Sequence, residues 1–286
     1  MTSIQPPMTL VTDGTGKTVA ALDPVTTKPY VYPPIWGSDY QPVVSLTARF
    51  PGARYTRVYG PHGMPTAAAL NAVPHPVILV GASFKGDTDP VAVTASLQAA
   101  RRPGRLLLVE TIHEMNRSIE HGGPTPAAYH ANFDKLAAVV RKLDPSGDEL
   151  GLTQTFMGYA ARHPDPGREW EHFARTDVDF VGVDLEWDDK LGTIAYPTPA
   201  ALQGIALTIR DNHPARKPLL YPEFAWRQLA YDTAGTGLAK FYADQAAFAA
   251  AHQVYAMAFY DTNGTTGPYR LLDGSPALAT VKKIIG

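Results

Sequence analysis

Residues 105–117 read RLLLVETIHEMNR, and this stretch decides the predicted fold. Its first part, LLLVE, is a continuous apolar run of the kind found in a β-strand that is buried on both faces. The run is followed at once by four polar residues, His113, Glu114, Asn116 and Arg117. A buried strand that ends in ionisable side chains is typical of a parallel barrel, whose strand ends carry the functional site.

Similar runs recur along the chain and make eight candidate strands in all. They lie at 30–36, 55–60, 76–82, 105–112, 150–157, 178–185, 217–224 and 254–260. Helix-like stretches alternate with them, the clearest at 89–101, 125–143, 198–211 and 236–252. Strand–helix alternation repeated about eight times predicts an α/β fold, a (β/α)8 TIM barrel. The polar residues after each strand are then expected to gather at one end of the barrel.

The first 28 residues do not fit the barrel alternation. Residues 8–23, MTLVTDGTGKTVAALD, resemble a small β-hairpin, because two apolar runs flank the turn residues Asp13, Gly14 and Gly16. We therefore divide the chain into an N-terminal β arm at 1–28 and a barrel at 29–286. The arm either closes the bottom of the barrel or serves homo-oligomerisation or docking, and the sequence leaves both open.

The composition excludes several classes of function. The chain has 286 residues, 45% of them hydrophobic, and a formal net charge of -2, so nothing favours a nucleic acid or an anionic membrane as partner. It has no cysteine, which excludes disulfides, thiolate metal sites and thiol catalysis. No apolar run is long enough to span a membrane, and the N-terminus lacks the features of a usual signal peptide.

Carboxylates and aromatic rings recur together where the predicted strands end. Glu114 follows the fourth run, and Glu223 lies at the end of the seventh. Two carboxylates roughly 5 Å apart support a double displacement, in which one attacks an anomeric carbon and the other protonates the leaving oxygen. We therefore predict Glu114 and Glu223 as catalytic residues. The predicted sugar-binding residues are His113, Asn116, Tyr159, Glu186, Trp187, Trp226, Tyr260 and Trp36.

The motif HEMN at 113–116, followed by the pattern T-P-x-x-Y at 125–129, resembles glycoside hydrolase family 26, the β-mannanase-like group. That family belongs to clan A of the retaining (β/α)8 glycoside hydrolases, with catalytic glutamates on strands four and seven. The resemblance implies Glu114 as the acid/base, His113 as its substrate-binding or pKa-setting neighbour and Glu223 as the nucleophile. It also implies a polysaccharide or oligosaccharide substrate, with no cofactor and no metal.

The sequence departs from the family pattern in three places. Glu110 stands where the family usually has an arginine, and RSIEHGG at 117–123 replaces an aromatic-rich stretch. At 184–186 the chain reads DLE where the family often has D-x-Y. The resemblance is therefore to the clan, and mannan is not carried over as the substrate.

The tyrosine of that D-x-Y pattern commonly donates a hydrogen bond to the nucleophile in the clan. Glu186 holds its place here, and a second negative charge beside Glu223 would raise the pKa of one of the two. We therefore expect Glu186 to lie away from Glu223 and to bind sugar hydroxyls. We expect Tyr159 or Tyr260 to donate the hydrogen bond instead.

Several residues keep two interpretations. Glu110 is expected to pair with Arg57 inside the barrel, because a buried charge needs a partner. Asp184, Glu186 and Asp188 form an alternative metal site, although the pattern lacks the glycine and terminal glutamate of a calcium loop. The tryptophans Trp36, Trp187 and Trp226 are either core residues or sugar platforms.

Two other functions stay open beside the glycosidase. One is a barrel that only binds carbohydrate, which the departures at Glu110 and Glu186 favour. The other is a recognition module of a larger assembly such as a phage tail. The missing signal peptide favours a virion protein or a non-standard route to extracellular action, and a cytoplasmic location stays open as well.

Overall fold

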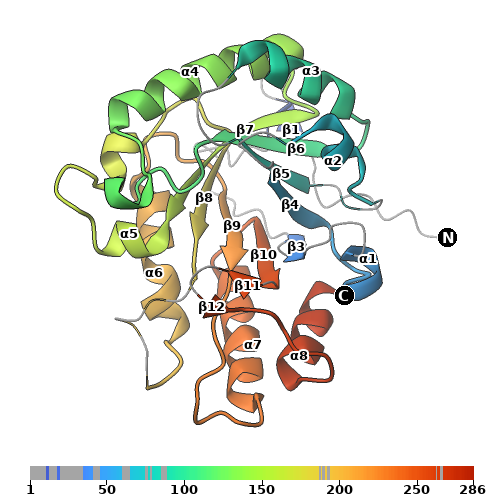
Figure 1. The fold of residues 1–286 in the computed structure, drawn as a ribbon, viewed down its shortest axis with the longest axis vertical. Helices are drawn as coiled ribbons and strands as arrows, with labels where there is room; N and C mark the ends of the chain where they lie inside the picture. Colours follow the sequence, from blue (N-terminus) through green and yellow to red (C-terminus); the bar gives the residue numbers. More distant parts are fainter. Residues whose placement is uncertain are drawn as a thin grey trace.

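In the computed structural model a barrel of strands is surrounded by helices (Figure 1). The structure describes residues 11–12, 18–19, 35–40, 46–59, 65–74, 77, 79–84, 89–186, 188, 191, 194–261, 263–264 and 267–286. Eight parallel strands close the barrel in the order β10, β3, β4, β5, β6, β7, β8, β9. The first and last barrel strands lie side by side, with Ile35 paired to Ala256. The predicted (β/α)8 barrel is confirmed.

The secondary structure alternates along the barrel as the sequence predicts. The barrel strands are β3 (Ile35–Tyr40), β4 (Tyr55–Tyr59), β5 (Leu79–Phe84), β6 (Leu106–Thr111), β7 (Leu150–Met157), β8 (Phe180–Asp184), β9 (Leu219–Phe224) and β10 (Ala256–Asp261). The α-helices are α1 (Leu46–Arg49), α2 (Ala67–Asn71), α3 (Pro90–Ala100), α4 (Pro126–Leu143), α5 (Gly158–Arg162), α6 (Pro199–Asn212), α7 (Thr236–Ala251) and α8 (Pro276–Ile285). Within the described residues, 3-10 helices lie at Ile119–His121 and Trp170–Phe173, and β11 (Asn263–Gly264) pairs with β12 (Gly267–Pro268).

Most predicted strands match the observed ones to within a few residues. The first is predicted at 30–36, and β3 runs from Ile35 to Tyr40. The part of this prediction at 30–34 lies outside the described residues.

Four helices share one local start signal. Each begins with a capping side chain that accepts a hydrogen bond from a backbone N–H, followed by proline at the first helical position, where its missing N–H costs nothing. The pairs are Asp89-Pro90, Thr125-Pro126, Thr198-Pro199 and Ser275-Pro276. These signals set where α3, α4, α6 and α8 begin.

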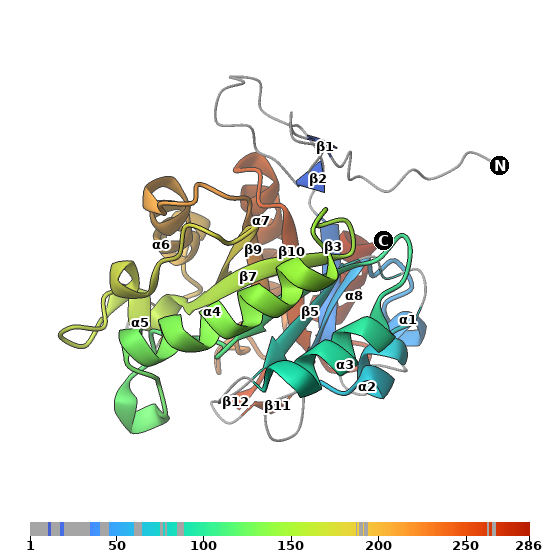
Figure 2. The same ribbon diagram turned by 90° about the horizontal axis from the view of Figure 1, so that it is seen from above.

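The core has two parts, separated by the wall of strands. The larger part lies between the strands and the helices, and Figure 2 shows α3 and α4 running along the outside of the barrel. The smaller part fills the barrel interior. Its members are Ile35, Tyr55, Leu106, Leu108, Phe180, Leu220, Ala256 and Ala258. An apolar interior layer of this kind makes the barrel a packed core, with no pore.

One step along the strands, the barrel interior changes from apolar to ionic. Side chains two residues apart on a strand share a face. On β4, Arg57 follows Tyr55, and on β6, Glu110 follows Leu108, and all four side chains are buried. Gly81 makes room for this layer, because a Cβ there would lie 3.1 Å from Arg57 Cγ. The stretch 105–117 therefore becomes polar where its strand leaves the apolar layer.

Strand β9 carries an irregularity beside the candidate nucleophile. Tyr221 pairs with Met257 and Phe224 pairs with Phe259, so two residues of β9 oppose one residue of β10. Tyr221 and Phe224 both belong to the outer core, although a regular strand would put residues three apart on opposite faces. Pro222 and Glu223 together oppose Ala258. An extra residue of this kind changes the direction of the side chains beside it.

The N-terminal segment is described at four residues. Val11 pairs with Val19 and Thr12 with Thr18 in antiparallel register, as the predicted hairpin requires. The rest of residues 1–34 lies outside the described residues, so the boundary at 28–29 and the role of the arm stay predictions. Among the described residues, no helix is long and apolar enough to cross a membrane.

His213, at the end of α6, is a buried histidine outside the catalytic end of the barrel. Its Nδ1 accepts a hydrogen bond from the backbone N–H of Ala215 at 3.2 Å, and its Nε2 lies 3.0 Å from Gln154 Oε1. The ring therefore carries its hydrogen on Nε2 and is neutral. Burial lowers the pKa of His213 to about 4.

We expect acid to destabilise the fold through His213. The unfolded chain takes up this proton near pH 6.5, and the folded protein resists until about pH 4. The free energy of unfolding should therefore decrease by about 3 kcal/mol as the pH falls through this window. Urea unfolding at pH 7 and pH 4.5 measures the decrease. His213→Gln should reduce it, whereas His172→Gln, on an exposed ring, should not.

Candidate active site

The turn after β6 holds two residues in a strained backbone conformation. Ile112 has φ 48° and Glu114 has φ 55°, in the left-handed region that non-glycine residues rarely adopt. For a β-branched residue such as Ile112 this is a genuine outlier, and strain of this kind collects at functional sites. The backbone N–H of Glu114 donates to Thr155 O of β7 at 3.1 Å, which helps to hold the turn.

Asn116 fixes the same turn to the end of β7. Its side-chain nitrogen donates to Met157 O at 3.1 Å, and its side-chain oxygen accepts from Met157 N at 2.7 Å. Asn116 is 1% exposed. The sequence predicts a sugar contact for Asn116, but in the structure both ends of its amide bind backbone. We infer that it positions the turn that carries Glu114.

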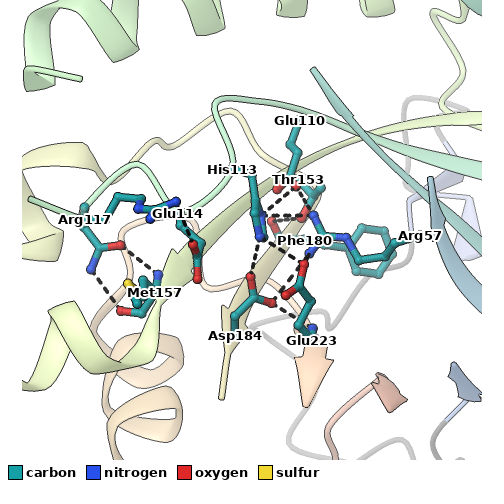
Figure 3. A network of polar contacts seen from close by, with 11 residues as sticks. Arg57, Glu110, His113, Glu114, Arg117, Thr153, Met157, Phe180, Asp184 and Glu223 are labelled. Carbon is teal, nitrogen blue, oxygen red and sulfur yellow. Dashed lines mark hydrogen bonds and ion pairs between the residues drawn. The ribbon is translucent and has the colours of Figure 1, made fainter. Parts of the chain in front are cut away.

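Arg57 lies at the centre of the ionic layer and contacts three carboxylates. Its guanidinium donates a short hydrogen bond to Glu110, as the predicted Glu110–Arg57 pair requires. It also lies 3.6 Å from Asp184 Oδ1 and 3.5 Å from Glu223 Oε1. Burial opposes its charge, but the three carboxylates outweigh burial and raise the pKa of Arg57. Figure 3 shows the side chain reaching from β4 toward the other members of the network.

His113 connects the two halves of this network (Figure 3). Its Nε2 lies 2.9 Å from Asp184 Oδ2 and 3.2 Å from Glu223 Oε1. Its Nδ1 lies 3.2 Å from Glu110 Oε1. Burial and the Arg57 guanidinium favour the neutral ring, but Asp184 and Glu110 outweigh them and raise the pKa of His113 to about 9. His113 is therefore a cation at neutral pH.

Glu223 is held between these two cations. Its side chain is 9% exposed, and its backbone N–H donates to Asp184 Oδ1 at 2.8 Å. Burial raises the pKa of Glu223, and the Arg57 guanidinium opposes that rise. A carboxylate that touches two buried cations is favoured in its ionised form.

Glu114 has a different environment. Its side chain is 11% exposed, and its ion-pair partner is Arg117, whose Nη1 lies 3.6 Å away and whose side chain is 40% exposed. Burial raises the pKa of Glu114, and the charge of His113 opposes that rise. Figure 3 shows Glu114 beside the network, without a dashed contact to Glu223. The predicted separation of roughly 5 Å between the two carboxylates stays a prediction.

The remaining predicted sugar-binding residues differ in burial and in how far the structure describes them. Trp226 is 1% exposed and its ring centre lies 5.6 Å from that of Phe241, so the core interpretation applies to it. Tyr159, Glu186 and Tyr260 are half-buried where β7, β8 and β10 end, and they stay candidates for sugar contact. Trp187 lies outside the described residues. For Trp36, in β3, the structure describes the backbone alone.

Two cations lie against the Glu223 carboxylate. Arg57 reaches it from β4, and His113 reaches it from the turn after β6. The expectation that Tyr159 or Tyr260 also donates a hydrogen bond to Glu223 stays a prediction. The expectation that Glu186 lies away from Glu223 and binds sugar hydroxyls stays a prediction as well.

Two groups of acidic residues bear on metal binding. The alternative site of Asp184, Glu186 and Asp188 is not formed, because Asp188 is fully buried and pairs with Arg162 at 2.8 Å. Ligand-type atoms of His113, Asp184 and Glu223 all lie within 4.8 Å of one another. The cations Arg57 and His113 already lie against both carboxylates, so we assign no metal to this group.

Arg57 is a site residue that the sequence analysis left out of its site prediction, as it also left out Asp184 and Glu110. Arg57 was assigned only to a structural pair with Glu110. A signal for it was present, because Arg57 interrupts the strand run YTRVY, and a lone charge inside a buried strand needs partners. The partners Asp184 and Glu223 come from distant strands, so the sequence could not identify them.

Comparison with known proteins supports the fold. No family model and no curated protein matches the sequence. A glucosidase from Croceicoccus marinus matches 89% of this chain and 67% of its own, with 13% identity and a TM-score of 0.59. An endo-1,4-β-D-mannanase from Thermotoga petrophila matches 88% and 99%, with 12% identity and a TM-score of 0.55. A family 5 xyloglucanase from Paenibacillus pabuli matches 92% and 93%, with 10% identity and a TM-score of 0.50.

These likenesses establish the architecture of the chain. Identities this low show the fold alone, and it is a (β/α)8 barrel shared with glycoside hydrolases. The resemblance to (β/α)8 glycoside hydrolases is thus confirmed at the level of the fold. The chain spans 30% of the length of two Bacteroides uniformis β-glucuronidase structures that also match. The membership of family 26 stays an inference from the motif HEMN.

Proposed function

We propose that this protein is a retaining glycoside hydrolase that acts on a polysaccharide or oligosaccharide. One observation carries the proposal: two buried glutamates at the carboxyl ends of barrel strands have unequal surroundings. Glu223 touches the buried cations Arg57 and His113, whereas Glu114 touches the half-exposed Arg117. Surroundings that separate the ionisation of two carboxyl groups are what acid and nucleophile roles require.

The charges of the network support this division of roles. Arg57 and His113 supply two positive charges, and Glu110, Asp184 and Glu223 supply three negative ones when ionised. A fourth buried negative charge at Glu114 would face this excess without a buried cation of its own. Glu114 therefore keeps its proton most easily and is the group suited to act as the acid.

In the proposed first step, the Glu223 carboxylate attacks the anomeric carbon while Glu114 donates its proton to the glycosidic oxygen. The bond to the leaving sugar breaks, and a glycosyl ester forms on Glu223. In the second step, the Glu114 carboxylate removes a proton from water, which attacks the same carbon and releases Glu223. Two inversions give net retention, and this geometry needs the carboxylates about 5 Å apart.

A panel of α- and β-linked glycans, including mannan and xyloglucan, tests the proposal. Proton NMR of the first product, recorded before mutarotation, should show the anomeric configuration of the substrate retained. An inverted product would contradict the double displacement. Binding to a glycan without hydrolysis would favour the carbohydrate-binding barrel instead.

The acid role of Glu114 leads to a leaving-group prediction. For Glu114→Ala we expect turnover of unactivated glycans to fall by about 10² to 10⁴-fold, because the leaving oxygen goes unprotonated. The first step on a dinitrophenyl glycoside should be largely spared, since that leaving group needs no proton. Burst kinetics on both substrates measure the difference. Glu120→Ala, at an exposed glutamate nearby, is the control. Equal losses on both substrates would contradict the assignment.

A role of the N-terminal arm in a homo-oligomer or a virion stays a prediction. Light scattering of the full chain, compared with a chain that begins at residue 29, tests it. The full chain should form the larger particle if the arm serves assembly.

A further inference from the structure

Glu110 is a buried carboxylate that the proposed mechanism does not use. It is 2% exposed and stands where the resembled family usually has an arginine. Its Oε1 accepts a short hydrogen bond from Arg57 Nη2 and lies 3.2 Å from His113 Nδ1. A carboxylate in contact with two other ionisable groups of the site can control their protonation.

The two nitrogens of the His113 ring face different kinds of partner. Nε2 lies between Asp184 Oδ2 and Glu223 Oε1, at 2.9 and 3.2 Å. Both partners are acceptors, so Nε2 carries a hydrogen whether the ring is neutral or charged. The charge of the ring is therefore decided at Nδ1.

Nδ1 has two competing neighbours. Arg57 Nη2, at 3.0 Å, is a donor and favours a bare nitrogen, which means a neutral ring. Glu110 Oε1, at 3.2 Å, is an acceptor and favours an N–H, which means an imidazolium. Within the described part of the chain, Glu110 is the acceptor in reach of Nδ1.

We propose that Glu110 is a positioning residue that holds a proton on Nδ1 of His113, so that the ring stands against Glu223 as an imidazolium. The contact between Glu110 Oε1 and His113 Nδ1 is present in the structure whether or not the protein is an enzyme. Its catalytic consequence, an ionised and oriented nucleophile, rests on the function proposed above.

The other groups around the ring are compatible with this state. Arg57 and Tyr59 face it from β4, Asp184 from β8 and Glu223 from β9, and Glu114 follows it in the chain. The Tyr59 ring meets the imidazole edge-on at 5.8 Å between centres. Burial and Arg57 favour the neutral ring, yet Asp184 and Glu110 raise the pKa of His113 to about 9.

Removal of the Glu110 carboxylate should leave Arg57 Nη2 as the neighbour of His113 Nδ1. In Glu110→Gln the carboxylate charge is lost, and Arg57 Nη2 can donate to a bare Nδ1. The ring then becomes neutral at a lower pH, and Glu223 loses a positive charge 3.2 Å away. Ionisation of Glu223 should consequently require a higher pH.

Nitrogen-15 NMR of histidine-labelled protein tests the proposal without a substrate. The chain has nine histidines, and the His113 signals are identified by their loss in His113→Asn. In the unaltered protein the His113 ring should titrate near pH 9. In Glu110→Gln the midpoint should fall to about pH 8 or below, a tenfold or larger change in the acid constant. Glu149→Gln, which removes a carboxylate from the half-exposed pair with Arg101, should leave it unchanged.

A His113 midpoint in folded Glu110→Gln equal to that of the unaltered protein would overturn the proposal, because Asp184 and Glu223 would then hold the charge alone. If Glu110→Gln does not fold, Glu110→Asp decides by the same criterion, since its shorter carboxylate moves away from Nδ1. Where hydrolysis is found, the acidic limb of kcat/KM should also move to higher pH. If the protein hydrolyses no glycan but the His113 midpoint falls in Glu110→Gln, the proposed function is contradicted and this inference is supported.

Discussion

Glu223→Gln is expected to remove hydrolysis of every glycan substrate while the fold persists. The amide cannot attack an anomeric carbon. Glu110 and Asp184, the other described carboxylates that contact Arg57 and His113, are engaged in the network and do not replace it. Loss of a nucleophile lowers kcat by on the order of 10⁴-fold or more. Activated aryl glycosides should suffer as much as natural ones, unlike in Glu114→Ala.

The stability of this variant separates a catalytic from a structural role. Replacing Glu223 leaves the cations Arg57 and His113 opposite the carboxylates Glu110 and Asp184, so the buried charges balance. We expect the free energy of unfolding, measured by urea titration, to change by about 1 kcal/mol or less. Glu149→Gln is the matched control for both measurements. A folded Glu223→Gln that keeps a tenth of the activity would exclude Glu223 as the nucleophile.

Arg57→Met is expected to cause the largest loss of stability. The guanidinium is 2% exposed and contacts Glu110, Asp184 and Glu223, so its removal leaves carboxylates buried without their shared partner. Breaking a buried ion pair from one side costs about 3–5 kcal/mol. Urea unfolding at neutral pH measures the loss. Arg101→Met, at a half-exposed ion pair with Glu149, should cost about 1 kcal/mol or less.

A second substitution tests whether this loss arises from unpaired charge. In Arg57→Met with Glu110→Gln, one of the stranded carboxylates is removed together with the cation. The double variant should therefore be more stable than the sum of the two single changes predicts, since contacting residues of one network are not additive. Additive losses would show that Arg57 contributes mainly through the packing of its methylene groups.

Local signals in the sequence were sufficient for the barrel itself. The capped starts of α4 and α6 follow from side-chain oxygens at Thr125 and Thr198, each followed by proline. The buried pair of Glu110 and Arg57 was predictable because a charge inside an apolar run needs a partner.

The contacts of the site were harder to predict, because they join strands far apart in the sequence. Asn116 carries the family-like motif and was expected to bind sugar, but Met157 occupies its amide. The contacts of His113 and Arg57 with Glu223 were not predicted. Each outcome depends on which strand ends lie next to one another, which only the closed barrel specifies.

The sequence by itself determined the eight strands, the capped helices and the two glutamates at strand ends, since periodicity and capping act over a few neighbouring residues. The direction of Glu223 was decided by the tertiary structure. In a regular strand, Tyr221 and Glu223 would lie on the same face of β9. In the structure Tyr221 shares the outer core with Phe224 instead. Pairing with β10 inserts the extra residue. That shift turns the Glu223 carboxylate toward Arg57 and His113, because strand register is set between strands and not within one.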